Sequence, residues 1–310
     1  MSKNFPGLKT AIIGGGSIGV GFAVVFTRAG YATTIADPGP TRRAAIPGEL
    51  VSRLRTLETY GLLEEPVEAI ANRLHVVADI SDAVRGADLV QECVPEREEI
   101  KRPLFAQLAE LTDEQCIIAS SSSFMTTTTS AGNTGVESRA LVAHPGNPPF
   151  AIPVIELVPN PQTRIEIVHR AREIYAGAGM SPVLVNKEYE GFIFNRLQGA
   201  LLREAYSLVR DGVASVEDVD TVVRDGLGRR WTFMGPFETV DLNTRGGISA
   251  HAKNMGPTYQ RMGRERGDTS EWTPDLVAEV TSQRRQTLPL DQWEDRVAWR
   301  DEQLLKRLGQ

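Results

Sequence analysis

The sequence predicts a two-domain protein, with an α/β domain built on a doubly wound, mostly parallel sheet and an all-α domain after it. Three observations support this fold class. Short runs rich in Val and Ile alternate with longer amphipathic stretches, a glycine-rich turn follows the first run, and helical patterns dominate the later part of the chain. The 310 residues are enough for two domains that each bury a core.

The expected elements of the first domain alternate along residues 1–188. The short apolar runs predict strands at 8–14, 32–37, 74–79, 88–94, 116–122, 140–145, 154–160 and 182–188. The amphipathic stretches predict helices at 17–29, 48–60, 81–86, 96–111 and 162–177. Because such alternation builds βαβ units, we expect helices on both faces of the sheet.

The pattern changes at residue 189, where we place the domain boundary. Residues 191–212, "GFIFNRLQGALLREAYSLVRDG", predict a long amphipathic helix that ends at Gly212. Residues 215–226, "SVEDVDTVVRDG", predict a helix with Ser215 as its N-cap. We therefore expect residues 189–310 to form an all-helical domain.

Composition narrows the function classes. The formal net charge of −6 gives no basic field for nucleic acid or anionic membrane. The start of the chain lacks the apolar core of a signal peptide, and no run is long enough to span a membrane. Cys93 and Cys116 lie in apolar runs, which is typical of reduced, buried thiols rather than of a disulfide framework or a metal cluster. We expect a cytoplasmic protein without a metal site.

Gly14, Gly16 and Gly19 form a G-x-G-x-x-G pattern after the first expected strand. In a dinucleotide turn, the first glycine permits the tight turn, the second lets the backbone approach a pyrophosphate, and the third lets helix and strand pack closely. The helix that begins near Ser17, with Ile18 in its first turn, would direct free N–H groups at the phosphates. The alternative is a glycine-rich turn without a ligand, but the strand-turn-helix context favours a nucleotide.

Asp37 ends the second expected strand, 18 residues after Gly19, where a carboxylate can bind ribose hydroxyls. The same carboxylate would repel a 2′-phosphate, so the pattern predicts NAD rather than NADP. Arg42 and Arg43 follow; they could accommodate NADP or form a solvated helix face.

Hydride transfer requires a base for the alcohol proton and a group that orients the base. Among the four histidines, His144 alone ends a strand and enters a proline-stiffened loop, "HPGNPPF". Glu156 lies in the apolar run "VIELV", where a carboxylate needs a partner. His144 would suit it, because a buried glutamate can fix the tautomer and stabilise the charged ring. A structural ion pair elsewhere is the alternative.

Two further polar features are candidates for binding the substrate. The run "SSSS" at 120–123 ends another strand at the same edge, where hydroxyls could donate to a substrate or a nicotinamide. Asn195 is polar within the apolar start of the long helix. Either feature could instead serve only local structure.

These motifs together resemble the 3-hydroxyacyl-CoA dehydrogenase family, and within it the subgroup of L-gulonate 3-dehydrogenase and lambda-crystallin. The resemblance runs nearly end to end, through "GGGSIG", "QECVPE", "SSSS", "AHPGNPPF", "IPVIELVPNP", "GFIFNRLQ", "EAYSLVRDGVAS", "GLGRRWTFMGP" and "WRDEQLLKRL".

The resemblance implies roles for individual residues. His144 corresponds to the catalytic histidine and Glu156 to its partner, while Ser123 and Asn195 correspond to the residues that contact substrate; Ser122 replaces Ser123 if the run is shifted by one. Cofactor contacts correspond to the turn Gly14–Gly19 with Ser17 and Ile18, and to Asp37, Glu96, Lys101, Ser123 and Asn147. The resemblance also implies a homodimer formed through the helical domain.

The implied mechanism is NAD-dependent oxidation of a 3-hydroxyl, in which neutral His144 takes the proton and Glu156 stabilises the imidazolium. Pro47 and Pro103 depart from the expected pattern, since both fall where helices are expected.

The substrate is expected to be a small 3-hydroxy acid, L-gulonate-like. Residues 49–73 carry five glutamates, three arginines and no lysine, which does not suit a polyanionic CoA tail. Arg229 and Arg230 in "GLGRRW" could bind a carboxylate, and the resemblance favours Arg230; a surface arginine is the alternative. The alternatives for function are a 3-hydroxybutyryl-CoA dehydrogenase, a carnitine 3-dehydrogenase with Trp231 and Phe233 around the trimethylammonium, and a non-catalytic crystallin-like protein.

Overall fold

The computed structural model describes residues 7–245 and 247–267, and after them residues 273–275, 282, 286, 289–292, 295, 298, 299, 302, 305 and 306. The chain divides into two compact units, one of Met1–Arg196 with Val297–Gln310 and one of Leu197–Arg296. Most of "WRDEQLLKRL" and most of the helical prediction after residue 267 lie outside the described residues.

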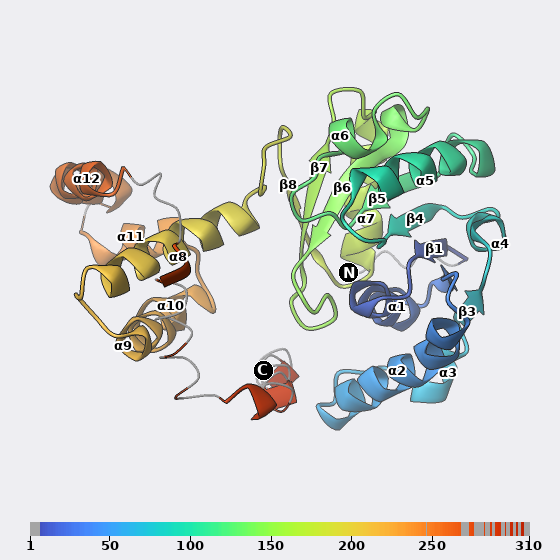
Figure 1. The fold of residues 1–310 in the computed structure, drawn as a ribbon, viewed down its shortest axis with the longest axis horizontal. Coiled ribbons are helices and arrows are strands. Elements are labelled where there is room, and N and C mark those ends of the chain that lie inside the picture. Colours follow the sequence, from blue (N-terminus) through green and yellow to red (C-terminus); the bar gives the residue numbers. More distant parts are fainter. Residues whose placement is uncertain are drawn as a thin grey trace. The chain divides into compact units, whose positions relative to one another are not determined.

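The first unit is a three-layer α/β structure around one eight-stranded sheet (Figure 1). Its strands are β1 (Lys9–Ile13), β2 (Ala32–Ala36), β3 (Leu74–Val77), β4 (Leu89–Glu92), β5 (Ile117–Ser120), β6 (Ala140–Pro145), β7 (Val154–Pro159) and β8 (Ser181–Leu184). The order is β3-β2-β1-β4-β5-β6-β7-β8, and every neighbouring pair is parallel except β6 and β7. The predicted fold class is confirmed.

Helices connect the strands and cover both faces of the sheet. They are α1 (Ser17–Arg28), α2 (Pro40–Thr59), α3 (Val67–Ala71), α4 (Ile80–Val84), α5 (Glu98–Leu111), α6 (Thr127–Ala131), the 3₁₀ turn η1 (Glu137–Arg139) and α7 (Ile165–Gly177). One core cluster packs α1, α2 and α7 on one face, including Ile12, Phe22, Phe26, Leu50 and Tyr175. A second packs α4, α5 and α6 on the other, including Ile13, Val90, Phe105, Ile118 and Ala131. Successive residues of β1 therefore serve opposite faces, as the pleat requires.

Helix α2 begins at Pro40, eight residues before the expected helix at 48–60. Pro40 occupies the first turn, where a missing N–H costs nothing. Pro47 lies inside α2 and Pro103 inside α5, and both side chains are exposed. The two helices tolerate these prolines because both lie on the exposed side of the helix. Water can there reach the backbone carbonyl that each proline leaves without a donor.

The regular elements in the described part of the second unit are all helices. Its helices are α8 (Phe194–Arg210), whose first turn belongs to the first unit, α9 (Val216–Thr221), the π-helical turn η2 (Val222–Leu227), α10 (Gly228–Trp231), α11 (Pro236–Asn243), α12 (Gly247–Glu265) and the 3₁₀ turn η3 (Leu290–Gln292). Ser215 caps α9 as predicted, since its hydroxyl accepts a hydrogen bond of 3.1 Å from the N–H of Asp218. No helix among the described residues is long and apolar enough to cross a membrane.

Candidate active site

The carboxyl ends of β1, β2, β4, β5 and β6 meet at one edge of the sheet, because these strands run parallel. The strand order reverses between β1 and β4, where open α/β sheets bind their ligands. The glycine turn and Asp37 follow strands that end at this edge, the serine run begins at the last residue of β5, and His144 lies one residue before the end of β6.

The glycine turn is closely packed at two of its three motif positions. Gly14 has a φ of +104°, and a Cβ there would lie 2.6 Å from the Cys93 carbonyl oxygen at the end of β4. A Cβ on Gly19 would lie 2.0 Å from the Gly14 carbonyl oxygen. Gly14 excludes a side chain because the backbone at the end of β4 lies against the turn, and Gly19 because α1 packs directly on it.

Gly16 differs, since a Cβ there would meet no atom within 4 Å. Gly16 is the N-cap of the 12-residue helix α1, whose first-turn N–H groups, those of Ser17, Ile18 and Gly19, lack carbonyl partners within the helix. An open backbone beside a helix N-terminus fits a pyrophosphate. Asp37 completes the cradle: its Oδ2 accepts from Gly15 N at 2.9 Å and its Oδ1 accepts from Gly39 N at 2.9 Å. The residues present therefore fit a dinucleotide.

His144 and Glu156 form a buried pair across the antiparallel ladder. They face each other in the β6–β7 register, and His144 Nδ1 lies 2.7 Å from Glu156 Oε2. The side chains are only 8% and 3% exposed. A carboxylate facing Nδ1 favours the tautomer that carries its proton on that nitrogen, which leaves Nε2 as an acceptor.

The second oxygen of Glu156 fixes the chain where it enters α8. Glu156 Oε1 accepts from Ile193 N at 2.7 Å and from Phe194 N at 2.9 Å. The imidazole also lies against aromatic rings, with its centroid 5.7 Å from that of Phe192 and 6.2 Å from that of Phe194. The ring of His144 is thus held by β7 and by the start of α8 together.

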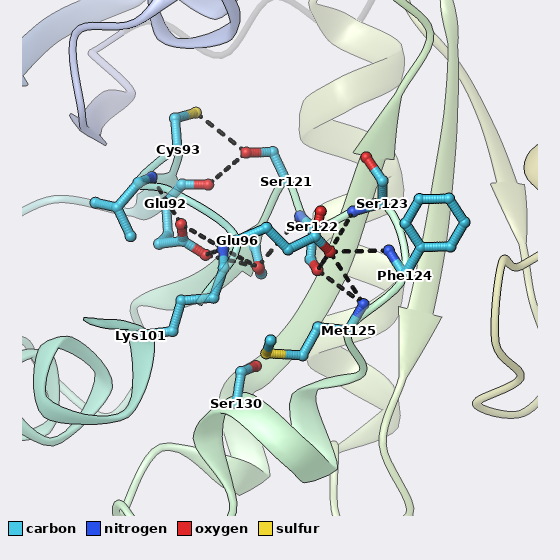
Figure 2. A network of polar contacts seen from close by, with 12 residues as sticks. Glu92, Cys93, Glu96, Lys101, Ser121, Ser122, Ser123, Phe124, Met125 and Ser130 are labelled. Carbon is cyan, nitrogen blue, oxygen red and sulfur yellow. Dashed lines mark hydrogen bonds and ion pairs between the residues drawn. The ribbon is translucent and has the colours of Figure 1, made fainter. Parts of the chain in front are cut away.

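Glu96 organises the serine run, as Figure 2 shows. Its Oε1 accepts from the Ser122 hydroxyl, and from the backbone N–H groups of Ser123, Phe124 and Met125 at 3.0, 2.9 and 3.1 Å. Burial raises the pKa of the Glu96 carboxyl, but these hydrogen bonds outweigh burial and hold that pKa below its ordinary value. Glu96 therefore stays ionised and holds the loop after β5.

The two candidate serines differ in their surroundings. Ser122 is buried, and its hydroxyl donates to Glu96 and accepts from Met125 N at 3.0 Å. Ser123 is half-buried, and within the described part of the chain its hydroxyl has no hydrogen-bond partner. Asn195 Nδ2 donates to the Ser123 carbonyl oxygen at 3.0 Å, so the structure brings these two predicted residues together.

Lys101 is enclosed beside this loop. Its ammonium donates to Glu92 Oε1 at 2.7 Å, to Glu92 Oε2 at 2.6 Å and to Ser120 Oγ at 3.5 Å (Figure 2). Lys101 is 1% exposed and Glu92 is 0% exposed. Since an ammonium has three donors, none remains for the predicted cofactor contact in this arrangement.

Glu92 is a residue that the sequence reasoning missed. It lies in the apolar run "DLVQECV", and the cost of burying an unpaired carboxylate, which singled out Glu156, applies equally to it. Its Oε2 also accepts from Ser120 Oγ at 2.6 Å, so it joins the ends of β4 and β5. The missed signal was a charged residue inside a strand.

Two predicted residues take part in none of these hydrogen bonds. Asn147 is exposed in the loop between β6 and β7. Arg230 is half-buried in α10 of the second unit.

Comparisons with known proteins match this architecture. Residues 9–189 match the model of the 3-hydroxyacyl-CoA dehydrogenase NAD binding domain, and residues 191–287 match the model of the C-terminal domain of the same enzymes. The chain belongs to the 3-hydroxyacyl-CoA dehydrogenase family. The enzymes of this family are NAD-dependent oxidoreductases that act on CH–OH groups.

Individual relatives of this family cover most of the chain. Lambda-crystallin of Oryctolagus cuniculus is 34% identical over 303 residues, which span 96% of this chain and 94% of that one. L-carnitine dehydrogenase of Streptomyces griseus is 36% identical over 266 residues, 86% of this chain and 76% of that one. The crystal structure of 5-formyl-3-hydroxy-2-methylpyridine-4-carboxylic acid 5-dehydrogenase, an NAD+-dependent dismutase, has a TM-score of 0.80 at 28% identity and covers 96% of both chains.

The different surroundings of two glycines generate a paired prediction. Gly19→Ala should lower the free energy of unfolding by more than about 2 kcal/mol, because its Cβ would meet backbone. Gly16→Ala should cost less stability than Gly19→Ala, about 1 kcal/mol at most for the change of N-cap. It should weaken NADH binding about tenfold or more, because its methyl would enter the open side of the turn. Urea unfolding and NADH fluorescence titration measure the two effects. Unchanged NADH affinity in a folded Gly16→Ala protein would contradict this placement of the pyrophosphate.

Proposed function

We propose that the protein oxidises the 3-hydroxyl of a small 3-hydroxy carboxylic acid, L-gulonate-like, with NAD as the hydride acceptor. The observation that carries this proposal is the buried His144–Glu156 pair at the carboxyl edge of the sheet. A buried imidazole with one nitrogen on a carboxylate and the other available as an acceptor is suited to general base catalysis.

The proposed chemistry assigns one task to each side chain. His144 Nε2 takes the proton of the 3-hydroxyl while the hydrogen on C3 leaves as hydride, which produces a 3-keto acid. NAD, held at the glycine turn and Asp37, supplies the hydride acceptor. Glu156 stabilises the imidazolium that forms, because its carboxylate already faces Nδ1.

Ser123 and Asn195 are proposed to hold the substrate oxygen. The choice of Ser123 over Ser122 rests on their contacts, since the Ser122 hydroxyl already bonds to Glu96 and Met125 N. Asn195 lies beside Ser123, and its contact to the Ser123 carbonyl keeps the two residues adjacent. Glu96 and Lys101 are proposed as positioning residues near the cofactor, acting through the serine loop.

A free acid is favoured over a CoA ester by the charges of residues 49–73. Arg53 donates to the Ser17 carbonyl oxygen at 2.9 Å, and Arg73 pairs with Glu65 at 2.5 Å. Two of the three arginines in this segment are thus engaged, which leaves little cationic surface for a phosphate-rich carrier. The names of two relatives also point to small carboxylic acids as substrates of those proteins, L-carnitine and a pyridine carboxylic acid.

Arg230 is the proposed anchor for the substrate carboxylate. It is half-buried, and no carboxylate among the described residues pairs with its guanidinium. A planar guanidinium binds a carboxylate through two parallel hydrogen bonds.

The assembly we propose is a homodimer formed by the second unit. Among the described residues of 197–296, the only buried apolar side chains are Val209 and Val216. Many large apolar side chains there are exposed, including Leu197, Phe233, Phe237, Leu242 and Met262. A second copy of the same unit would bury this surface.

Light scattering on a sizing column tests the assembly. We expect twice the mass of one chain at micromolar concentration. A monomer at every concentration up to about 100 μM would contradict the dimer, because the dissociation constant of a dimer with an interface of standard size lies well below that concentration.

The general base is tested by His144→Asn and Glu156→Gln. Both should lower kcat by about 10²–10⁴-fold with NADH affinity unchanged, because neither side chain is proposed to bind the cofactor. Glu156→Gln keeps a carbonyl oxygen for the N–H groups of Ile193 and Phe194. Its free energy of unfolding should therefore change little, and the fall in kcat should be larger than any loss of folded protein explains. Full turnover by His144→Asn would refute the mechanism.

The substrate class is tested by NAD reduction with L-gulonate, 3-hydroxybutyrate, L-carnitine and 3-hydroxybutyryl-CoA. We expect kcat/KM for a free acid to exceed that for the CoA ester. Arg230→Met should raise KM for that acid about 10–100-fold with a small effect on kcat.

Arg229→Met is the matched control for this test, since Arg229 is exposed beside Arg230. It should leave KM within about twofold of the original value. A preference for the CoA ester would support acyl-CoA oxidation instead, and an absence of turnover on all four compounds would support a crystallin-like role. Equal KM values in the Arg230 variant and the original protein would remove Arg230 as the anchor.

A further inference from the structure

The start of α2 carries an arginine that lies against the glycine turn. Arg42 donates through Nε to the Gly15 carbonyl oxygen. Its two terminal nitrogens donate to the two carboxylate oxygens of Glu49, with Nη2 2.7 Å from Oε2. Glu49 lies seven residues later on the same helix, two turns away, and therefore on the same side.

Arg42 is also next to the carboxylate that fits the ribose. The Gly15 peptide lies between the two side chains, because its N–H donates to Asp37 Oδ2 at 2.9 Å while its carbonyl accepts from Arg42. The hydrogen bond with Glu49 is the main reason that the pKa of Arg42 lies above its ordinary value, and the charge of Asp37 contributes in the same direction. Arg42 is thus a permanent cation beside Asp37.

A cation at this place has a known chemical consequence. Dinucleotide folds that accept a 2′-phosphate place an arginine near the end of the second strand, where it binds that phosphate. Arg43 is turned to the backbone instead, since its Nη1 donates to the carbonyl oxygens of Asp37 and Pro38 at 2.8 Å each. Arg42 is therefore the residue that a 2′-phosphate would recruit, and Glu49 occupies both ends of its fork.

We propose that Glu49 is a specificity-determining residue, which keeps the protein selective for NAD by holding the Arg42 guanidinium in an internal ion pair. Asp37 disfavours the 2′-phosphate by direct repulsion. Glu49 adds a second barrier, because NADP would have to break a bidentate carboxylate contact and leave that carboxylate beside its own phosphate. The inference rests on the glycine turn and Asp37 as the cofactor cradle and is independent of the proposed hydroxy acid.

Arg53 provides an internal comparison. It lies 4.0 Å from Glu49 Oε2 and donates to the Ser17 carbonyl oxygen, on the pyrophosphate side of the turn. NAD and NADP share the same pyrophosphate. A change at Arg53 should therefore alter the affinity for both cofactors equally, whereas a change at Arg42 should alter the affinity for NADP alone.

The test is a set of fluorescence titrations with NADH and NADPH, which require no substrate. We expect Glu49→Ala to lower the ratio of the NADPH to the NADH dissociation constant about tenfold, since one charge-assisted hydrogen bond to the 2′-phosphate becomes available. The matched control is Glu58→Ala, an equal change of charge at an exposed position of the same helix, which should leave the ratio unchanged.

Two double variants locate the effect. Glu49→Ala with Arg42→Met should restore the original ratio, and Glu49→Ala with Arg53→Met should keep the lowered one. If Glu49→Ala does not fold, Glu49→Gln removes the charge and keeps the hydrogen-bond acceptor.

Three outcomes would each overturn the inference. They are an unchanged ratio of dissociation constants in the Glu49 variant, an equal fall of the ratio in the Glu58 variant, and a fall that persists when Arg42→Met is added. Failure of the hydroxy-acid proposal would appear only in turnover assays.

Discussion

The candidate site depends on one carboxylate, that of Glu156, which connects three segments of the chain. One oxygen faces His144 on the neighbouring strand, and the other accepts two backbone N–H groups at the start of α8. A buried carboxylate needs partners for both oxygens, because an unpaired one is costly in a medium of low polarity. The requirement that stabilises Glu156 therefore also sets the position of the proposed base and of the segment at the start of α8, which carries Asn195.

Glu92 is a second buried carboxylate, and it supports the neighbouring strand pair, β4 and β5. Glu92 and Lys101 are fully enclosed, and Ser120 completes their contacts. Removing either partner would strand the other charge in the core, so the pair holds β4, β5 and α5 in one arrangement. Glu96 then fixes the loop that follows β5 through its contacts to the serine run. The proposed reacting groups are thus held in place by three carboxylates, those of Glu156, Glu92 and Glu96.

Much of this arrangement could be predicted from the sequence, because the signals are local or periodic. Each of the eight expected strands corresponds to an observed one. Short runs rich in Val and Ile between glycine and proline turns strongly favour the strand conformation. The start of α2 could not be placed, because a proline usually interrupts a helix, whereas Pro47 is exposed and the helix continues through it. The short helices α3 and α6 have too few turns to show a period.

The side chains divide in the same way. The partner of Glu156 could be inferred because a glutamate in an apolar strand demands one, and His144 was the histidine at a strand end. Ser122 and Ser123 could not be distinguished from the sequence, since identical neighbours give no way to fix the alignment. In the structure their hydroxyls differ, because that of Ser122 bonds to Glu96 and to Met125 N. The sequence left two roles open for Arg42, NADP binding or a solvated helix face, because it does not show that Glu49, two turns along the helix, faces Arg42.

The antiparallel pairing of β6 with β7 has a consequence for how this protein can vary. His144 and Glu156 are aligned by the ladder itself, and a slip of one residue would turn Glu156 to the opposite face of the sheet. The alignment extends over five residue pairs of the ladder, from Leu141 with Pro159 to Pro145 with Ile155. A change in the length of the loop of residues 146–153 is therefore compatible with the His144–Glu156 pair only if it keeps this register.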